Sequence, residues 1–439
     1  MNFLIILLFS HTMGFMEYFE ITGGKKLSGT IDVRGSKNAA TPILAATLLT
    51  TKKCEISNLP LIEDVFRMLE IIESLGAVVE WTGKRSVAIT AKKIDPKKMD
   101  RIKVKQLRSS ILLLGPLSAR CERFALPQPG GCVIGARPVG THFDALAKMG
   151  VSIRNTKEAY AVDARKKRYA DIILKEFSVT ATENAMMLAA GVAGKTVIKI
   201  AAAEPHVEDL GKFLSGLGVR ITGLGTHTIT IHGRKNLRGT KHKVISDFNE
   251  AATFLILGVA TKSPLTVTNA NSDHLDLVLE KLRLCGANFE IKGKKITIVP
   301  PRKILSLEKI EARIYPGIPT DVQAPFGVLA TQADGKTLIF DTLYEARLKY
   351  LAELRKMGAK ARILNDHQAV ITGPTKLKGK KIMSFDLRAG ASLIIAALVA
   401  EGTTQISNAY QVDRGYERIE ERLQKLGAKI KRRSATNKK

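Results

Sequence analysis

A short glycine motif recurs six times along the chain and limits the folds that the chain can adopt. Each copy places Gly after a Leu, Met or Cys and before an Ala or Val, and the six glycines are Gly76, Gly150, Gly218, Gly286, Gly358 and Gly427. Successive glycines lie 74, 68, 68, 72 and 69 residues apart. Near-equal intervals indicate a repeated structural unit, here of about 70 residues.

Each unit carries the same pattern of secondary structure. An amphipathic helical pattern precedes the glycine, as in YLAELRKM before Gly358, and the glycine stands where a helix needs a left-handed C′ residue. Short alternating strands follow, such as AVVEW after Gly76. An earlier helix is apolar on every side, as in EAATFLILGVA and ASLIIAALVA, which predicts a core helix too short to span a membrane.

Six mixed units predict an α/β protein with two domains of three units each. The chain has 439 residues, which exceeds one ordinary domain, and its 45% hydrophobic content is ample for two cores. We expect the buried helices at the centre of each domain, with sheets and outer helices around them.

The net charge of +28 allows two interpretations. One is a nucleic-acid surface, where aromatic side chains often alternate with basic ones. The other is a basic surface that draws small anionic substrates into a cleft. Aromatic residues make up only 5% of the chain, which favours the second interpretation and no nucleic-acid partner.

The four cysteines, Cys54, Cys121, Cys132 and Cys285, are scattered, with no CxxC pair and no Cys/His cluster. Neither a disulfide framework nor a metal site is expected, and a reducing, cytoplasmic compartment fits. The apolar run at residues 3–9 is too short to span a bilayer, so we expect no membrane partner. Residues 1–15 are interpreted as an extension from an upstream start codon, with Met16 beginning the domain.

The segment PQPGGCVIGARPVGTH, residues 127–142, is the candidate catalytic loop. Its glycines and prolines exclude a helix or a central strand. Cys132 stands in it without bulky neighbours, and Arg137 could lower the pKa of the thiol or bind an anion. A glycine-rich turn with an incidental cysteine is the alternative.

Several blocks give the sequence a family resemblance. They include LSGTIDVRGSKNAATPILAATLL, PGGCVIGARPV, YPGIPTDVQAPF, DLRAGASL and DRGYERIEERL. In order and spacing they resemble the UDP-N-acetylglucosamine 1-carboxyvinyltransferases, enolpyruvyl transferases that open peptidoglycan synthesis. The cysteine loop distinguishes them from the related shikimate-phosphate enzymes. The resemblance implies two inside-out α/β barrel domains: residues 16–36 with 246–431, and residues 37–245, followed by a basic tail at 432–439.

The resemblance also implies the reaction, in which enolpyruvyl moves from phosphoenolpyruvate to the 3′-hydroxyl of UDP-N-acetylglucosamine, without a metal or organic cofactor. Cys132 matches the proton donor and Asp321 the general base. Lys37 and Asn38 match the phosphoenolpyruvate site. Guanidinium groups around the phosphate and carboxylate would come from Arg137, Arg347, Arg388 and Arg414. Lys37 and Arg414 are also expected to act in catalysis.

Other positions match contacts to the nucleotide sugar. They are Arg108, Pro138, Val139, Gly140, Thr141, Ser178, Val179 and Leu343. Supporting acidic positions in the cleft would be Asp247, Glu250 and Asp386. Taken alone, Lys37 could be a solvated lysine beside a helix start, and Asp321 could be a helix N-cap.

Three positions depart from the family pattern: Gly140 replaces the usual Asp, Thr180 a common Gly, and Glu176 a Lys found in some members. They motivate a second hypothesis, an enolpyruvyl transferase acting on another hydroxyl acceptor. A third, from a different class, is a basic nucleic-acid-binding protein built on the same repeats. We expect a monomer.

Overall fold

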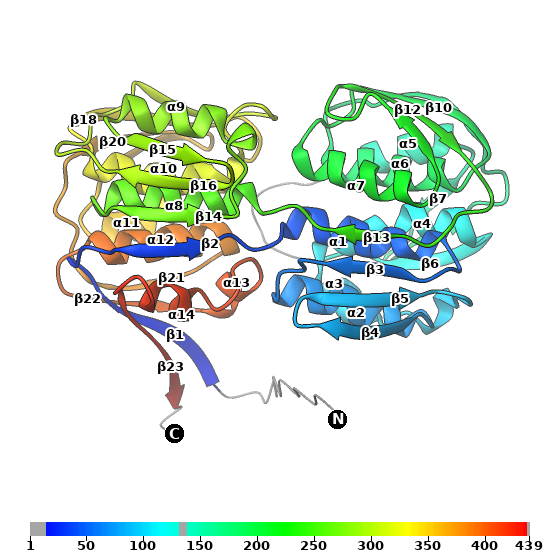
Figure 1. The fold of residues 1–439 in the computed structure, drawn as a ribbon, viewed down its shortest axis with the longest axis horizontal. Helices are drawn as coiled ribbons and strands as arrows, with labels where there is room; N and C mark the ends of the chain where they lie inside the picture. The colour runs from blue at the N-terminus through cyan, green and yellow to red at the C-terminus, as the bar shows by residue number, and fades with distance from the viewer. Residues whose placement is uncertain (1–14, 131–137, 437–439) are drawn as a thin grey trace.

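The computed structural model describes residues 15–130 and 138–436, which form two halves lying side by side (Figure 1). Each half has its own hydrophobic core. One core draws on residues 39–244, and the other on residues 19–33 together with 248–430. The expected mixed α/β architecture with two centres is therefore observed.

In the half built from residues 39–244, three apolar helices lie at the centre. They are α1 (Lys37–Ala46), α4 (Leu114–Arg120) and α6 (Val179–Ala190). Three sheets surround them. Their strands, in spatial order, are β13 (Lys241–Lys243), β3 (Cys54–Ser57), β5 (Ser86–Thr90) and β4 (Val78–Gly83); β6 (Arg123–Pro127), β8 (Ala159–Asp163) and β7 (Ser152–Asn155); and β11 (Arg220–Thr222), β12 (Thr228–Gly233), β10 (Gly194–Lys199) and β9 (Asp171–Ile173).

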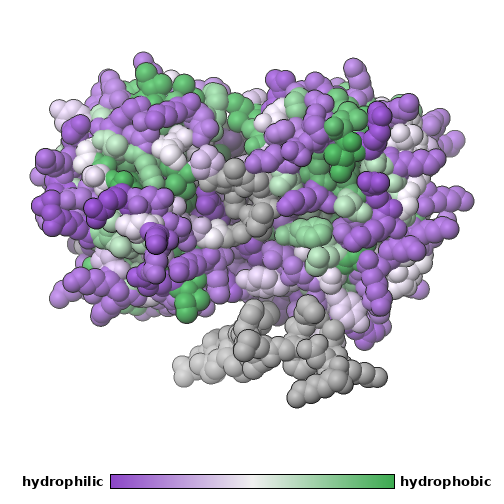
Figure 2. All heavy atoms as spheres, turned by 180° about the vertical axis from the view of Figure 1, so that it is seen from behind, coloured by the Kyte–Doolittle hydropathy of each residue, from purple (hydrophilic) through white to green (hydrophobic). Residues whose placement is uncertain are grey.

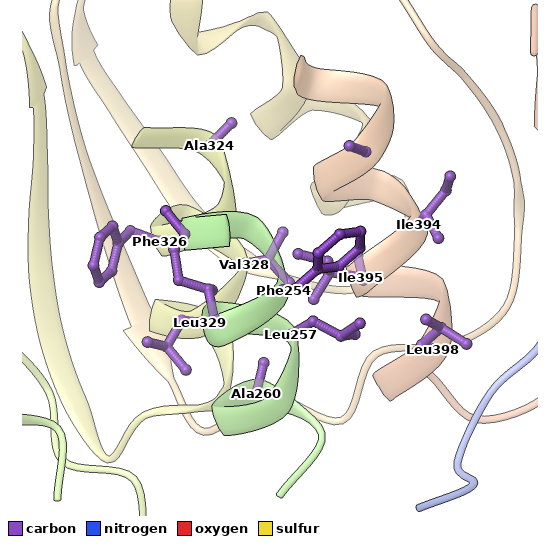
Figure 3. Close-up of a cluster of buried hydrophobic side chains, with 14 of the residues drawn as sticks. Phe254, Leu257, Ala260, Ala324, Phe326, Val328, Leu329, Ile394, Ile395 and Leu398 are labelled. Carbon is purple, nitrogen blue, oxygen red and sulfur yellow. The ribbon is translucent and has the colours of Figure 1, made fainter. Parts of the chain in front are cut away.

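The other half repeats this plan around α8 (Phe248–Ala260), α10 (Thr320–Gln332) and α12 (Leu387–Val399). Every residue of α8 is buried, as its nearly all-apolar sequence predicts. Side chains from the three helices pack together in the core, among them Phe254 and Leu329 (Figure 3).

Three four-stranded sheets enclose this second core. In spatial order they are β21 (Lys381–Met383), β22 (Thr403–Ser407), β1 (Phe15–Thr22) and β23 (Lys429–Thr436); β15 (Asn288–Lys292), β16 (Lys295–Val299), β14 (Leu265–Thr268) and β2 (Gly29–Asp32); and β17 (Lys309–Ala312), β18 (Gly335–Asp341), β20 (Gln368–Gly373) and β19 (Lys360–Asn365).

The repeated glycines end the outer helices, as predicted. These helices are α2 (Glu63–Ser74), α5 (Gly140–Lys148), α7 (Pro205–Gly216), α9 (Asp276–Leu284), α11 (Tyr350–Lys356) and α14 (Ile419–Gln424). All six glycines have positive φ angles, from 79° at Gly150 to 101° at Gly358. L-residues with a Cβ atom rarely adopt this conformation, which explains why glycine recurs there.

The chain passes twice between the halves, and the two passages lie side by side. Gly35 and Ser246 form an antiparallel bridge, and the Ser36 N–H donates to the Ile245 carbonyl at 2.7 Å. The Asp247 N–H donates to the Arg34 carbonyl at 2.8 Å. We propose domain limits at these passages, giving residues 16–36 with 246–431, and residues 37–245.

The C-terminal segment differs from the separate basic tail expected at residues 432–439. Residues 432–436 instead continue β23, which pairs with β1 as far as Thr436 opposite Phe15. Arg432 forms ion pairs with Asp413 at 2.6 Å and with Glu420 and Glu17 at 2.8 Å. These three carboxylates offset the charge of Arg432, one of the basic residues of the expected tail.

The surface is largely hydrophilic on the face seen in Figure 2, with hydrophobic side chains in smaller groups. Within residues 15–130 and 138–436, no helix is both long enough and apolar enough to cross a membrane.

Candidate active site

Asp321 and two arginines form a compact group at the ends of the central helices of one half. Asp321 is the second residue of α10, and one of its carboxylate oxygens pairs with Arg347. Its other oxygen accepts a hydrogen bond from Arg388 Nε at 3.2 Å. Pro319 is the N-cap residue of α10, so the alternative interpretation of Asp321 as the cap is wrong.

The two arginines are held by further acceptors. Arg347 Nε donates to Thr320 Oγ1 at 3.1 Å, and its Nη1 lies 3.4 Å from Asp386 Oδ1. Arg388 Nη2 donates to Asp247 Oδ2 at 3.3 Å. Among the described residues, the buried Arg388 Nη1 has no hydrogen-bond partner. An unsatisfied guanidinium N–H in this position is suited to bind an anion.

Electrostatics keep Asp321 ionised. Burial raises the pKa of Asp321, but the charges of Arg388, Arg347 and Lys37 lower it more, to about 2. Although burial lowers both values, Asp321 and Asp386 hold the pKa of Arg347 above its usual value, and Tyr416 together with Asp247 and Asp321 does the same for Arg388. Asp321 is thus a charged acceptor within electrostatic reach of Lys37, a residue of the other half.

Lys37 and Arg414 meet at a carboxylate that the sequence analysis missed. Lys37, the first residue of α1, places Nζ 3.5 Å from Asp64 Oδ2. Arg414, which follows α13 (Tyr410–Asp413), donates from Nε to Asp64 Oδ1 at 3.0 Å. The Lys37 side chain is only 17% exposed, so it is not the solvated lysine of the alternative interpretation. Asn38 lies beside it, half-buried.

Arg108 marks a second region of the site. It begins the 3-10 helix Arg108–Leu113, and burial lowers its pKa while Tyr160 and Tyr344 raise it. The charge of Arg108 also helps to lower the pKa of His142, although burial has the larger effect. Arg108 therefore lies within electrostatic reach of His142, the neighbour of Thr141, and of Tyr344, the neighbour of Leu343.

All three departures from the family pattern lie in this region. Thr141 Oγ1 donates to Glu176 Oε1 at 2.6 Å, and His142 Nε2 lies 2.8 Å from Thr180 Oγ1. Gly140, the first residue of α5, is exposed, and a Cβ atom there would meet no atom of the described residues within 4 Å. These contacts tie the start of α5 to the start of α6.

The remaining nucleotide-sugar positions lie at helix starts or on the surface. Pro138 is exposed and Val139 is the N-cap residue of α5. Ser178 caps α6 by accepting from the Ala181 N–H at 3.4 Å, and Val179 is the first residue of that helix. Leu343 is 38% exposed.

Cys132 and Arg137 lie outside the described residues. The other three cysteines do not have the exposure that a reactive thiol needs: Cys54 and Cys285 are buried and Cys121 is half-buried. Burial raises the pKa of Cys54 to about 11 and that of Cys285 to about 12, and it also raises the pKa of Cys121. In residues 15–130 and 138–436, no group of three or more His, Cys, Asp or Glu side chains could hold a metal ion.

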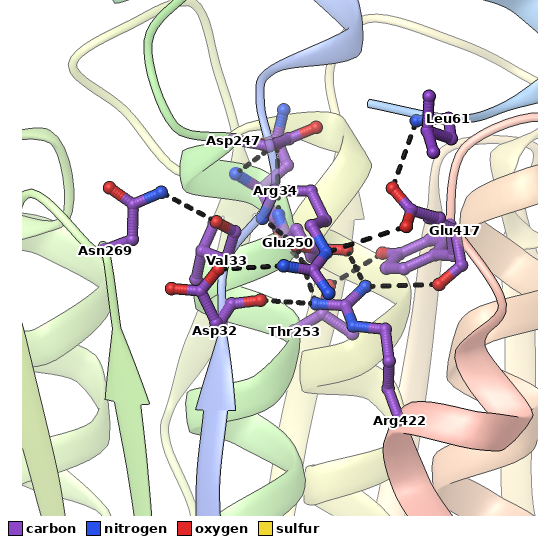
Figure 4. Close-up of polar contacts among 12 residues, drawn as sticks. Asp32, Val33, Arg34, Leu61, Asp247, Glu250, Thr253, Asn269, Glu417 and Arg422 are labelled. Atoms are coloured by element: carbon purple, nitrogen blue, oxygen red, sulfur yellow. Dashed lines mark hydrogen bonds and ion pairs between the residues drawn. The ribbon is translucent and has the colours of Figure 1, made fainter. Parts of the chain in front are cut away.

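The supporting acids divide between two tasks. Asp247 and Asp386 contact the arginines of the site, whereas Glu250 lies at the passage between the halves (Figure 4). Glu250 accepts from the Arg34 N–H at 2.8 Å and from Arg422 Nη1 at 2.6 Å. Glu250 therefore stabilises the passage, and no ion pair described for it involves Arg347 or Arg388.

Comparison with known proteins places the chain in a family. Residues 21–423 match the family described as EPSP synthase (3-phosphoshikimate 1-carboxyvinyltransferase). A UDP-N-acetylglucosamine 1-carboxyvinyltransferase of Campylobacter hominis is 43% identical over 95% of this chain and 100% of its own length. A protein of that name from Bradyrhizobium diazoefficiens is 41% identical, covering 94% of this chain and 97% of the relative.

Solved structures agree with the fold. The enolpyruvyl transferase NikO from Streptomyces tendae superposes with a TM-score of 0.86 at 26% identity, covering 96% of this chain and all of NikO. EPSP synthase from Acinetobacter baumannii, at 20% identity, has a TM-score of 0.70 over 95% of this chain and 100% of that chain. The chain therefore has the two-domain enolpyruvyl transferase fold and belongs to the UDP-N-acetylglucosamine 1-carboxyvinyltransferases of the EPSP synthase family.

Proposed function

We propose that the protein transfers the enolpyruvyl group of phosphoenolpyruvate to the 3′-hydroxyl of UDP-N-acetylglucosamine and releases phosphate. The observation that carries the proposal is one ionised carboxylate, Asp321, held by Arg347 and Arg388 within electrostatic reach of Lys37. Relatives of the same name, 41–43% identical over nearly the whole chain, support this substrate pair.

The cations of the site bind the anionic substrate. Phosphoenolpyruvate carries a phosphate and a carboxylate, and arginine pairs with two oxygens of such a group at once. Lys37 and Arg414 approach from different halves, and Arg388 offers the unpartnered Nη1. Arg137 would complete the set from the loop. A group of cations of this kind binds the substrate and neutralises charge during reaction.

The chemistry is an addition followed by an elimination. The 3′-oxygen bonds to C2 of phosphoenolpyruvate and gives its proton to Asp321, while C3 takes a proton from Cys132. The resulting tetrahedral carbon then loses phosphate: its bond to the phosphate oxygen breaks, and C3 returns a proton to the Cys132 thiolate to restore the double bond. The departing phosphate takes the proton held by Asp321, so both side chains regain their starting states. No metal or organic cofactor takes part in these steps.

Substrate binding should strengthen Asp321 as a base. A carboxylate with a pKa of about 2 is a weak proton acceptor at neutral pH. When the substrate anion binds Arg347 and Arg388, its negative charge offsets part of their positive charge. The two arginines then stabilise the ionised form of Asp321 less, and the pKa of Asp321 rises. Asp321 thus becomes a competent base only after phosphoenolpyruvate binds.

A second candidate is transfer to a different hydroxyl acceptor. Glu176 and Thr180 contact the start of α5, and Gly140 leaves open space there. Binding nucleic acid does not require a buried, ionised carboxylate such as Asp321 paired with two arginines. The nucleic-acid-binding hypothesis is therefore disfavoured. We further propose a cytoplasmic, monomeric enzyme of peptidoglycan precursor synthesis.

The test is phosphate release from phosphoenolpyruvate with a panel of acceptors: UDP-N-acetylglucosamine, UDP-N-acetylgalactosamine, uridine monophosphate and 3-phosphoshikimate. We expect release with UDP-N-acetylglucosamine to exceed that with every other acceptor. Release confined to another acceptor would favour the second candidate, and release with none would contradict both.

A further inference from the structure

Asp64 is a buried carboxylate that the reaction scheme does not use. It is the second residue of α2 and is 3% exposed. A carboxylate is costly to bury unless cations or hydrogen-bond donors compensate it. Here each oxygen faces one cation, Arg414 at 3.0 Å and Lys37 at 3.5 Å.

The two cations belong to different halves of the molecule. Lys37 begins α1 next to the first passage, whereas Arg414 lies 350 residues from Asp64 along the chain. Two positive charges facing one point repel each other, and the shared carboxylate offsets this repulsion. Asp64 can therefore hold both cations only while the halves stay together.

Further contacts join residues 61–85, which include α2, to residues 410–417 of the other half. We call this interface the seam. Arg67 Nη2 donates to the Tyr410 hydroxyl at 3.2 Å. Glu417 pairs with Arg85 and accepts from the Leu61 N–H at 3.0 Å. The seam thus has one carboxylate facing the site cations, Asp64, and another, Glu417, facing Arg85.

We propose that Asp64 is a positioning residue for phosphoenolpyruvate, which sets Lys37 and Arg414 in register across the two halves. It acts through these cations and does not touch the substrate. The proposal rests on the proposed function for its substrate, phosphoenolpyruvate. It links the packing of the two halves to the assembly of the anion site.

Asp64→Asn tests this, because it keeps the side-chain shape and removes the charge. We expect kcat/KM for phosphoenolpyruvate to fall at least 30-fold, while KM for the sugar nucleotide changes less than threefold. Adding Asp64→Asn to Arg414→Met should lower kcat/KM for phosphoenolpyruvate less than threefold below that of Arg414→Met alone, because a positioning residue acts through its partner. The matched control is Glu417→Gln, which removes the other seam carboxylate and should stay within threefold of wild type.

Direct titration of phosphoenolpyruvate by calorimetry needs no turnover, so it separates this proposal from the choice of acceptor. Wild type that binds phosphoenolpyruvate 10-fold more tightly than Asp64→Asn supports the proposal even if the acceptor is another one. Equal binding, or an equal loss in Glu417→Gln, overturns it. If Asp64→Asn fails to fold, Asp64→Glu displaces the charge by one methylene and should weaken binding at least fivefold; unchanged binding overturns the proposal.

Discussion

Replacing Arg422 by Met should strongly destabilise the half that contains α8. Arg422 and Glu250 are 7% and 2% exposed and form a two-pronged ion pair, with N–O distances of 2.6 and 3.1 Å. Arg422 Nη2 also donates to the Asp32 carbonyl at 2.8 Å, and its guanidinium lies over the Phe254 ring. Met keeps an apolar stem but leaves the buried carboxylate without its cation, with the Arg34 N–H still donating to it at 2.8 Å.

Removing one partner of a buried pair costs about 3–5 kcal/mol. We expect a loss of that size in the free energy of unfolding, measured by urea denaturation at pH 7 with circular dichroism. Adding Glu250→Gln to Arg422→Met should recover at least half of the loss, because the charge left unpaired is gone.

An exposed arginine provides the matched control. Arg283 pairs with Glu280 at 3.6 Å, with exposed fractions of 46% and 55%, and also lies over an aromatic ring, that of Phe289. Arg283→Met should cost about 0–1 kcal/mol. A loss below about 1 kcal/mol in Arg422→Met, or a double variant no more stable than the single one, would refute the reasoning.

Three further predictions concern the site and the repeats. Asp321→Asn should lower kcat for phosphate release by about 10²–10⁴-fold, the usual contribution of a general base, and a smaller loss would argue against that role. His142, whose pKa is about 4 when folded against 6.5 in the reference state, takes up a proton only on unfolding between these values. The free energy of unfolding should therefore fall as pH drops from 6.5 towards 4, and this group contributes about 1.4 kcal/mol per pH unit. In His142→Asn, the free energy of unfolding measured by urea denaturation should depend less steeply on pH. Gly427→Ala should lower the free energy of unfolding by about 1–2 kcal/mol, measured by urea denaturation, because φ is +91° there and a residue with a Cβ atom rarely adopts that angle. No atom of the described residues lies within 4 Å of the added Cβ, so the loss would report backbone strain alone. An unchanged free energy of unfolding would mean that the helix ends do not require glycine.

Local patterns predicted the repeated architecture. The glycine spacing, the amphipathic helices and the all-apolar helices depend on neighbours a few residues away, and the structure confirms them at Gly76 and in α8. These features needed no knowledge of how the halves meet.

Contacts between distant segments were not predictable in this way. Asp64 has the sequence context of an ordinary acidic residue in the first turn of an amphipathic helix, and its partner Arg414 lies 350 residues away. Residues 432–436 were predicted to belong to a basic tail, because the carboxylates that pair with Arg432 come from three other segments. Family blocks identified Lys37, Asp321 and the arginines, together with Asp247 and Asp386, which hold Arg388 and Arg347. They did not identify Asp64, which holds Lys37 and Arg414.

The most direct test of the central claim is the structure of the product. Phosphoenolpyruvate labelled with ¹³C at C2 is incubated with UDP-N-acetylglucosamine and either the wild-type protein or Cys132→Ala, and the product is analysed by NMR. We predict a labelled enol ether on the 3′-oxygen with the wild-type protein, and at least 100-fold less with the variant. No labelled ether with the wild-type protein, or equal amounts with both, would contradict the proposed reaction or the role of Cys132.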